Sequence, residues 1–224
     1  MKRITVLLVD DHMVVREGFR QMLELEADLQ VVGEAQDGRQ AVSLAKKLRP
    51  AVVLMDIAMP RLNGLEATRQ VLKAVPTTKV IILSAHADDS YVQDAGESGA
   101  VGFLLKQSSA HEVCQGIREV QKGKTFYCSA VGRRLDRLHR QSPHLRGAPG
   151  KNAVQLTSRE LEVIQLIAEG KANKETAAEL GVGIKTVEKH REHLMAKLDI
   201  HDTAGLTRYA IAAGIIESSV QLTI

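Results

Sequence analysis

Residues 7–12 read "LLVDDH", an apolar run that ends abruptly in two adjacent carboxylates, Asp10 and Asp11. A short apolar run of this kind is typical of a buried β-strand. Two like charges side by side repel one another, and the arrangement is unfavourable unless a cation lies beside them. The stretch therefore predicts a buried strand with a cation at its carboxyl end.

Outward from this stretch, short apolar runs alternate with segments of helical periodicity through the first half of the chain. The predicted strands are residues 4–9, 30–35, 51–55, 79–84 and 101–105, and the predicted helices lie near 13–25, 38–48, 64–74, 89–97 and 109–121. Strands and helices that alternate in this way predict an α/β fold, with a doubly wound, five-stranded parallel sheet covered by helices on both faces.

Polar side chains stand at the carboxyl ends of four of these predicted strands. In an open α/β sheet these ends share one edge, where ligands collect. Grouped carboxylates with no cysteine or paired histidine beside them suit Mg²⁺. An aspartate beside Mg²⁺ that faces a lysine and a serine is arranged for phosphoryl transfer to its carboxylate. The residues that form this predicted edge are Asp10, Asp11, Asp56, Ser84 and Lys106.

Four segments of this half resemble the landmark segments of response-regulator receiver domains: "VLLVDDH", "VVLMDIAMPRLNGLEA", "VIILSAH" and "GAVGFLLKQ". The resemblance covers residues 3–121 and implies a flavodoxin-like receiver domain with Asp56 as the phosphoacceptor. It implies Mg²⁺ as the cofactor, with Asp10, Asp11, Asp56 and the carbonyl of Ala58 as its ligands. The remaining positions that it implies act in the switch and in phosphate binding: Ser84, Phe103 and Lys106.

A phosphate on Asp56 is expected to attract Lys106 and Ser84 and to let Phe103 turn inward. That movement would change the surface formed by the fourth helix, the fifth strand and the fifth helix. Two histidines, His12 and His86, flank the same edge, and we expect polar surface roles for both.

A magnesium-dependent phosphohydrolase with an aspartyl nucleophile is the alternative from another class of protein. Enzymes of the haloacid-dehalogenase type carry that nucleophile on the first strand in a D-x-D pair. This chain has D-D there and no evident substrate cap. We therefore expect a protein that is not an enzyme, beyond accepting and slowly losing its own phosphoryl group.

Residues 156–200 contain the pattern of a helix-turn-helix. Thr157 and Glu160 predict a capping box before an apolar stripe, so a helix begins there. A second helix is predicted to open at Asn173 or Lys174, Gly181 supplies a tight turn, and a third helix begins near residue 184. A short helix, a turn with glycine and a second helix make up this motif.

The third of these helices is predicted to enter the major groove of double-stranded DNA. Its apolar stripe leaves a polar outer face, whose carboxylates can accept from cytosine and whose lysine can donate to guanine. The predicted base-reading residues are Glu188, Lys189 and Glu192, and the predicted phosphate contacts are Lys185, Thr186 and Arg191. Asn173 and Lys174 complete the predicted DNA-binding set.

Residues 154–219 resemble LuxR/FixJ-type DNA-binding domains through "LTSRELEVIQLIAEG", "NKETAAELGV" and "KTVEKHREHLMAKL". Together the two halves resemble response regulators of the NarL/FixJ subfamily, which implies a transcription regulator phosphorylated by a sensor histidine kinase. The resemblance also implies a homodimer on phosphorylation, with RNA polymerase as a candidate partner. The last helix, near residues 203–214, either adds a dimer contact or only packs in the core. A ligand-sensing LuxR-type regulator shares only the second half and would not supply the acidic pocket.

Composition indicates two small domains joined by a basic linker, predicted at residues 122–153. Residues 122–155 hold 8 Lys/Arg against 1 Asp/Glu, whereas residues 1–121 hold 14 against 16 and residues 156–224 hold 8 against 10. With only two cysteines, Cys114 and Cys128, we expect a reducing cytoplasm and neither a disulfide framework nor a cysteine zinc site. No apolar run approaches the ~18–20 residues of a membrane span, and no signal-peptide pattern follows Met1.

Overall fold

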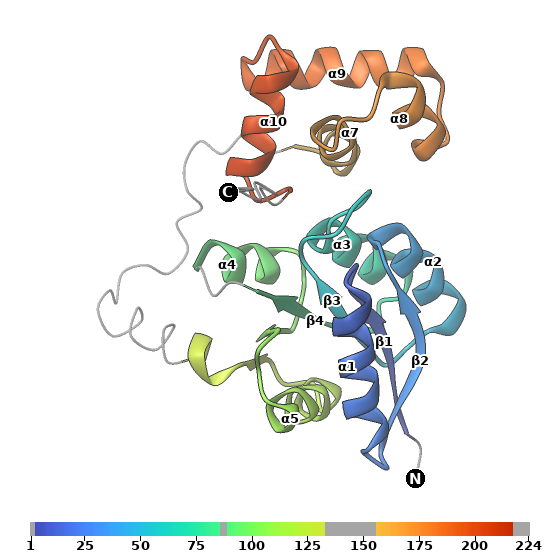
Figure 1. Cartoon of the computed structure of the whole chain (residues 1–224), viewed down its shortest axis with the longest axis vertical. Helices are drawn as coiled ribbons and strands as arrows, with labels where there is room; N and C mark the ends of the chain where they lie inside the picture. Colours follow the sequence, from blue (N-terminus) through green and yellow to red (C-terminus); the bar gives the residue numbers. More distant parts are fainter. Residues whose placement is uncertain (1–2, 86–88, 133–155, 217–224) are drawn as a thin grey trace. The chain divides into compact units, whose positions relative to one another are not determined.

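The computed structural model describes residues 3–85, 89–132 and 156–216, which fall into two compact units. The first unit is an α/β domain and the second is all helical, so the predicted fold class is confirmed (Figure 1). Within these described residues, no helix combines the length and the apolar character needed to cross a membrane.

The first unit alternates strands and helices along the chain. Its strands are β1 (Ile4–Val9), β2 (Leu29–Ala35), β3 (Val52–Asp56), β4 (Lys79–Ser84), β5 (Gly102–Leu105) and β6 (Phe126–Tyr127). Its helices are α1 (Met13–Glu24), α2 (Gly38–Leu48), α3 (Gly64–Ala74), α4 (Asp89–Glu97) and α5 (Ala110–Gln121). Each strand and helix predicted for this half is present, with its ends within one residue of the prediction.

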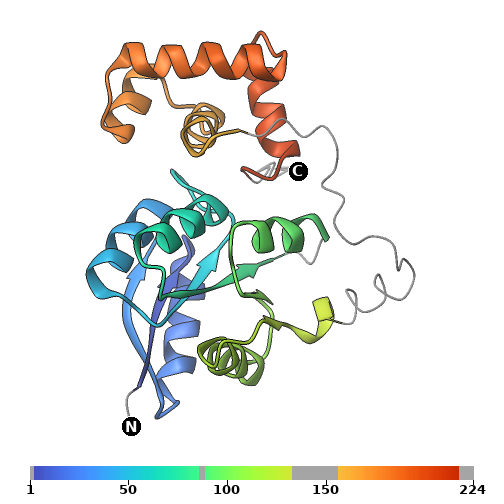
Figure 2. The ribbon, with the colours of Figure 1, turned by 180° about the vertical axis from the view of Figure 1, so that it is seen from behind.

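All strands of the sheet run parallel, in the order β2-β1-β3-β4-β5-β6. The order reverses between β1 and β3, and open α/β sheets bind ligands in the crevice at such a reversal. Helices cover both faces: α1 packs beside α5, and α2 beside α3, as the opposite views in Figures 1 and 2 show. Because both faces are covered, strand β3 is buried along its whole length.

The sheet has one strand more than the five predicted. Strand β6 lies within the range predicted as the linker, and it pairs with Gly102 and Phe103 of β5. Two residues are too few for apolar periodicity to reveal a strand. The ring of Phe126 lies against α5 at Gly116, where an added Cβ would come within 2.9 Å of it. The first unit therefore continues past residue 121, while residues 133–153 of the predicted linker lie outside the described residues.

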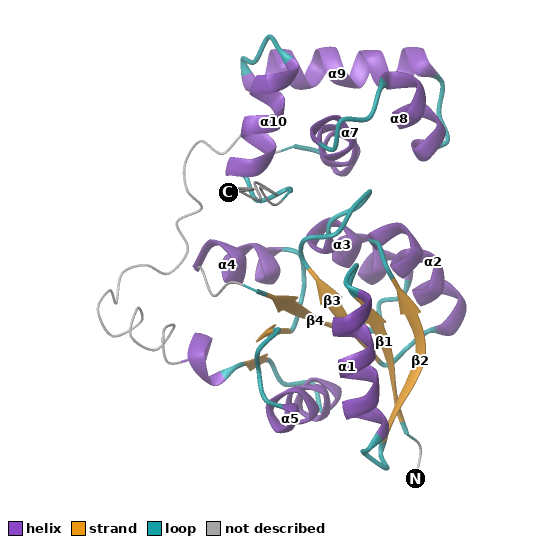
Figure 3. Cartoon of the chain, viewed as in Figure 1, coloured by secondary structure: helices purple, strands orange, loops and turns teal. Residues whose placement is uncertain are grey.

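The second unit consists of α7 (Ser158–Ala168), α8 (Asn173–Leu180), α9 (Ile184–Leu198) and α10 (Thr203–Ala212), all drawn as helices in Figure 3. Helix α7 packs against each of the other three. Helices α8 and α9 are joined by a turn at Gly181, whose φ of 64° is left-handed, and they form the predicted helix-turn-helix. Leu206 and Ala210 of α10 are fully buried in the core of this unit, so α10 does pack there, and its dimer contact stays a prediction.

The capping box predicted before α7 is confirmed. The N–H of Glu160 donates to Oγ1 of Thr157 at 3.3 Å, and the N–H of Thr157 donates to Oε2 of Glu160 at 2.8 Å. The same Oε2 lies 2.8 Å from Nζ of Lys197, near the end of α9. Burial raises the pKa of Glu160, but the hydrogen bonds from Lys197 and Thr157 outweigh it and lower the pKa overall. This contact fixes the end of α9 against the start of α7.

Candidate functional site

Two carboxylates and one ammonium meet at the carboxyl edge of the sheet. Asp10 follows β1 directly and Asp56 ends β3, and these two strands are neighbours. Lys106 follows β5, and its Nζ lies 2.8 Å from Oδ2 of Asp10 and 2.8 Å from Oδ2 of Asp56. Both carboxylates are buried, with side chains only 2% and 3% exposed. The parallel strands therefore bring these three residues together, as their places at strand ends predicted.

The pocket has more negative than positive charge. Burial is the main cause that raises the pKa of Asp56 from 3.8 to about 7, and the charge of Asp10 adds to it while Lys106 opposes it. Burial lowers the pKa of Lys106, but the two carboxylates outweigh burial and raise it overall. One ammonium therefore only partly compensates two buried carboxylates.

The residues present fit a divalent cation. Ligand atoms of Asp10, Asp11, His12 and Asp56 lie within 4.8 Å of one another. Three of them are carboxylate oxygens, which Mg²⁺ prefers, and a dication would relieve the repulsion that contributes to the raised pKa of Asp56. His12 is exposed, and its Nδ1 lies 2.8 Å from Oδ1 of Asp11. The other flanking histidine, His86, lies outside the described residues.

Ser84 and Phe103 lie on strands β4 and β5, and Ala58 follows strand β3. Ser84 ends β4 and is buried, and its carbonyl accepts the backbone N–H of Lys106 at 2.8 Å. Ala58 is half-buried, two residues after Asp56 in the loop that leads to α3. The Phe103 side chain is fully buried within β5. The ring lies inside in the structure, and the expected movement of Phe103 on phosphorylation stays a prediction.

Two residues that the sequence patterns did not single out as functional shape the pocket. Gly64 donates its N–H to the carbonyl of Ile57 at 2.8 Å, and an added Cβ there would stand 1.8 Å from the carbonyl oxygen of Asp56. Arg16 of α1 donates from Nη1 to the carbonyl of Asp10 at 2.7 Å. A glycine at the start of α3 was a visible signal for the first, whereas no local pattern indicates the second.

The raised pKa of Asp56 predicts how stability depends on pH when no divalent cation is present. Between 3.8 and about 7, the folded state keeps a proton on Asp56 that the unfolded state has released. The unfolding free energy therefore falls as pH rises through this window. Above about pH 7 the folded state has lost all of the stability that the ionisation of Asp56 removes. Asp56→Asn removes the titrating group, and at about pH 8 it should raise the Tm of the first unit by at least ~4 °C, because one pKa unit corresponds to ~1.4 kcal/mol.

Thermal unfolding in EDTA at several pH values measures this effect. Near pH 4 Asp56 is protonated in the folded state and still about half protonated in the unfolded state, so the Tm values of the two proteins should differ far less than at pH 8. Adding MgCl₂ at high pH should reduce the Tm difference between Asp56→Asn and the wild type. A Tm difference that stayed constant from pH 4 to pH 8 would contradict a raised pKa for Asp56.

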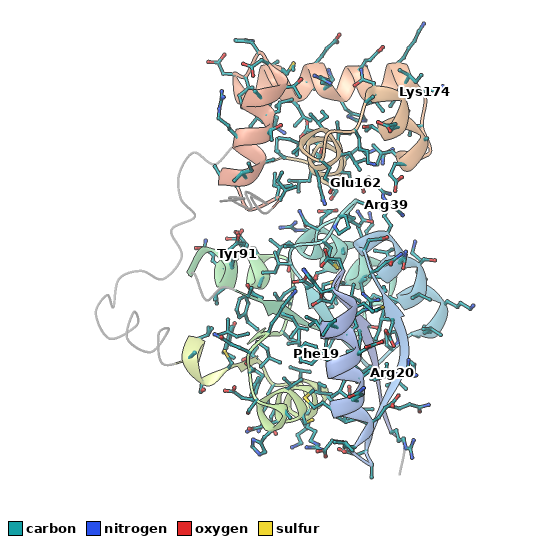
Figure 4. All side chains as sticks on the ribbon, in the orientation of Figure 1. Phe19, Arg20, Arg39, Tyr91, Glu162 and Lys174 are labelled. Atoms are coloured by element: carbon teal, nitrogen blue, oxygen red, sulfur yellow. The ribbon has the colours of Figure 1, made fainter. Side chains whose placement is uncertain are left out.

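Most of the predicted DNA-binding residues lie on exposed surfaces of α8 and α9. Lys174, labelled in Figure 4, is exposed at the start of α8. Figure 4 also shows side chains that project from α9 away from α7. On α9, Val187 and Leu194 are fully buried on the inner side. The exposed members of the predicted set on this helix are Lys185, Thr186, Glu188, Lys189 and Glu192.

Arg191 and Asn173 are only partly exposed, and they bond to each other within the unit. Nη1 of Arg191 lies 3.3 Å from Oδ1 of Asn173, and its Nη2 donates to Oγ1 of Thr203 at the start of α10. Arg191 therefore joins α8, α9 and α10, whatever it contributes toward DNA.

Two family models match the chain. The response regulator receiver domain matches residues 6–118, and the luxR family of bacterial regulatory proteins matches residues 154–210. The first match contains the whole acidic pocket, and the second contains the helix-turn-helix.

Known relatives match along most of the chain. The transcriptional regulatory protein LiaR of Bacillus subtilis is 43% identical over 211 residues, which cover 92% of this chain and 96% of the relative. The transcriptional regulatory protein DegU of Brevibacillus brevis is 35% identical and covers 89% of both chains. The response regulator protein VraR of Staphylococcus aureus is 33% identical and covers 96% of this chain and 99% of its own.

Solved structures are similar over the same extent. The RcsB response regulator of Salmonella typhimurium is 26% identical with a TM-score of 0.57, covering 95% of this chain and 100% of that one. An RcsB–DNA complex has a TM-score of 0.56 at 26% identity, over 93% of this chain and 98% of that one. The matched domains, their order and the shared length show that the chain belongs to the response regulators with a luxR-type DNA-binding domain, which regulate transcription under the control of phosphorylation.

Proposed function

We propose that Asp56 is the residue that accepts the phosphoryl group. The observation that carries this proposal is the Lys106 ammonium, 2.8 Å from the buried carboxylates of both Asp56 and Asp10. Such a pocket has an aspartate as nucleophile and a fixed cation beside it. The chain is a regulator rather than a classical enzyme, so its own chemistry is limited to accepting this group and slowly losing it.

In the proposed reaction, a carboxylate oxygen of Asp56 attacks the phosphorus of a phosphohistidine on a sensor histidine kinase. The phosphorus–nitrogen bond breaks, and the imidazole leaves with a proton from solvent. The Lys106 ammonium pairs with the phosphoryl oxygens, and the Ser84 hydroxyl donates a hydrogen bond to one of them. Mg²⁺ supplies neutralising charge when it is bound, and its proposed ligands are Asp10, Asp11, Asp56 and the Ala58 carbonyl.

The proposed target is double-stranded DNA, and the RcsB–DNA complex among the similar structures supports it.

Phosphorylation is proposed to favour a homodimer in the cytoplasm, with RNA polymerase as a further partner. Two copies on a two-fold axis would read half-sites about one helical turn, ~10 base pairs, apart. A phosphate can shift such an equilibrium only by bonding better in one state than in the other. Sedimentation of the phosphorylated and unphosphorylated chain measures the shift.

Intact-mass analysis tests the phosphoacceptor directly. The full chain is incubated with MgCl₂ and acetyl phosphate, and the wild type should gain the mass of one phosphoryl group. Asp56→Ala should gain none, because the nucleophilic oxygen is absent. A gain of the same mass in Asp56→Ala would place the phosphoacceptor elsewhere and reject the assignment.

The predicted DNA-binding residues of α8 and α9 are proposed to divide between bases and phosphates. Glu188, Lys189 and Glu192 would read base edges, and Lys185, Thr186 and Arg191 would hold the DNA backbone. Asn173 and Lys174 complete the proposed set.

A pair of lysine variants on α9 tests this division. Lys189→Ala should relax the preference at one base pair, at a cost of ~1–3 kcal/mol. Lys185→Ala should weaken binding to all sequences and reduce the salt slope by about one. Fluorescence anisotropy at several salt concentrations, with a duplex selected by the chain from a random library, measures both. A uniform loss in Lys189→Ala would move this residue to the phosphate group.

A further inference from the structure

Arg16 of α1 is bonded to the backbone of the acidic pocket. Its Nη1 donates to the carbonyl of Asp10 at 2.7 Å, and its side chain is only 14% exposed. The backbone N–H of Arg16 donates to the carbonyl of His12 at 3.1 Å, so Arg16 lies in the first turn of the helix. Its side chain therefore reaches back across the turn from β1 to α1, the turn that carries Asp10 and Asp11.

The Arg16 guanidinium is itself held from β2. Its Nε lies 3.4 Å from Oε2 of Glu34. The other oxygen of this carboxylate accepts from Nη1 of Arg20 at 2.7 Å. Glu34 stands beside Leu8 in the β1–β2 register, so a strand next to the pocket fixes the guanidinium. A planar guanidinium suits this place, because one nitrogen donates to a carbonyl while the delocalised charge pairs with a carboxylate.

The backbone and the side chain of Asp10 are both held by hydrogen bonds and an ion pair. Its N–H donates to the carbonyl of Ala35 at 3.2 Å, and Oδ1 accepts the N–H of His12 at 2.8 Å. Its other carboxylate oxygen lies 2.8 Å from Lys106. The Asp10 carbonyl accepts from Nη1 of Arg16 at 2.7 Å, so the backbone and the carboxylate of this residue are both bonded.

We propose that Arg16 is a positioning residue for the divalent cation, because its bond to the Asp10 carbonyl orients the turn so that the carboxylates of Asp10 and Asp11 converge with Asp56. The inference rests on the proposed function, since it takes these carboxylates as the cation ligands. Groups that hold metal ligands in place contribute about 10–100-fold to metal affinity.

Calorimetric titration of the full chain with MgCl₂ tests the role of Arg16. Arg16→Gln should raise the Kd for Mg²⁺ by about tenfold or more, because the shorter, uncharged side chain loses the hydrogen bond to the Asp10 carbonyl and the ion pair with Glu34. Arg16→Lys keeps the charge without the planar guanidinium and should bind Mg²⁺ with intermediate affinity. Phosphorylation by acetyl phosphate should need about tenfold more Mg²⁺ for half-maximal rate in Arg16→Gln, with the rate at saturating Mg²⁺ within about twofold of wild type.

The chain offers a matched control in Arg20. Within the described residues, Arg20 bonds the carboxylates of Glu24 and Glu34 and lies one turn further along α1. Arg20→Gln therefore removes an arginine with the same partner, and it should leave the Kd for Mg²⁺ within about twofold of wild type. An equal weakening in Arg20→Gln and Arg16→Gln would overturn the positioning role, as would a wild-type Kd in Arg16→Gln. Should Arg16→Gln fail to fold, a wild-type Kd in Arg16→Lys would overturn it.

Asp11→Asn separates this inference from the proposed function. If Asp11→Asn binds Mg²⁺ as the wild type does, the cation ligands are wrongly assigned, and both the proposed site and the role of Arg16 fail. If Asp11→Asn weakens binding and Arg16→Gln does not, the site stands and only the role of Arg16 fails. Weakening in both Asp11→Asn and Arg16→Gln, but not in Arg20→Gln, supports the inference.

Discussion

Gly64→Ala is expected to slow phosphorylation by acetyl phosphate about 100-fold and to lower the unfolding free energy of the first unit by about 1–3 kcal/mol. The added Cβ would stand 1.8 Å from the carbonyl oxygen of Asp56 and 2.8 Å from its carbonyl carbon. Both are backbone atoms, so no side-chain rotation relieves the overlap. The loop between β3 and α3 must shift, and the phosphoacceptor proposed at its start moves with it.

Gly18→Ala is the matched control for this prediction. Gly18 lies in α1 with nothing within 4 Å of an added Cβ. Alanine is favoured over glycine inside a helix, so this variant should gain roughly 0.5–1 kcal/mol. Thermal unfolding and the initial phosphorylation rate are measured for both variants. If Gly64→Ala behaved like Gly18→Ala in both measurements, the close approach of Gly64 to Asp56 would not constrain the loop.

The pocket could be predicted from the sequence because each of its residues follows a local pattern. Asp10, Asp56 and Lys106 each stand where an apolar run ends, and parallel strands bring such ends to one edge. The capping box at Thr157 is also local, since both of its bonds join residues three positions apart. In these places the spacing of residues along the sequence is enough to predict which of them lie close together in space.

Other features depend on contacts that spacing does not reveal. The bond from Arg16 to Asp10 requires the direction of a side chain, and the bond from Arg191 to Thr203 requires the packing of α9 against α10. The full burial of the Phe103 ring likewise depends on the packing around β5, because the strand pattern places the residue but does not show how far its side chain is enclosed. Strand β6 is too short for its periodicity to be read. Each of these features depends on tertiary packing, which the spacing of residues along the sequence does not show.

Lys106→Met is expected to lower the unfolding free energy of the first unit by about 3–5 kcal/mol when no divalent cation is present. The substitution keeps an unbranched side chain but removes the ammonium that lies 2.8 Å from both Asp10 and Asp56. The two carboxylates then remain buried with no cation between them. The pKa of Asp56, already about 7, should rise further, because the charge and the hydrogen bond of Lys106 lower it in the wild type.

The loss in Lys106→Met should depend on pH and on Mg²⁺. It should shrink near pH 5, where Asp56 is protonated in the folded state, and MgCl₂ at pH 8 should restore more stability to the variant than to the wild type, because the dication replaces the missing charge. Phosphorylation at saturating Mg²⁺ should still be slower by about 100-fold or more, since the group that neutralises the phosphoryl oxygens is gone. Lys73→Met, at an exposed position of α3, is the control for the loss of a lysine. Equal Tm values for Lys106→Met and Lys73→Met in EDTA at pH 8 would mean that Lys106 does not hold the buried carboxylates, and the account of the pocket would fail with it.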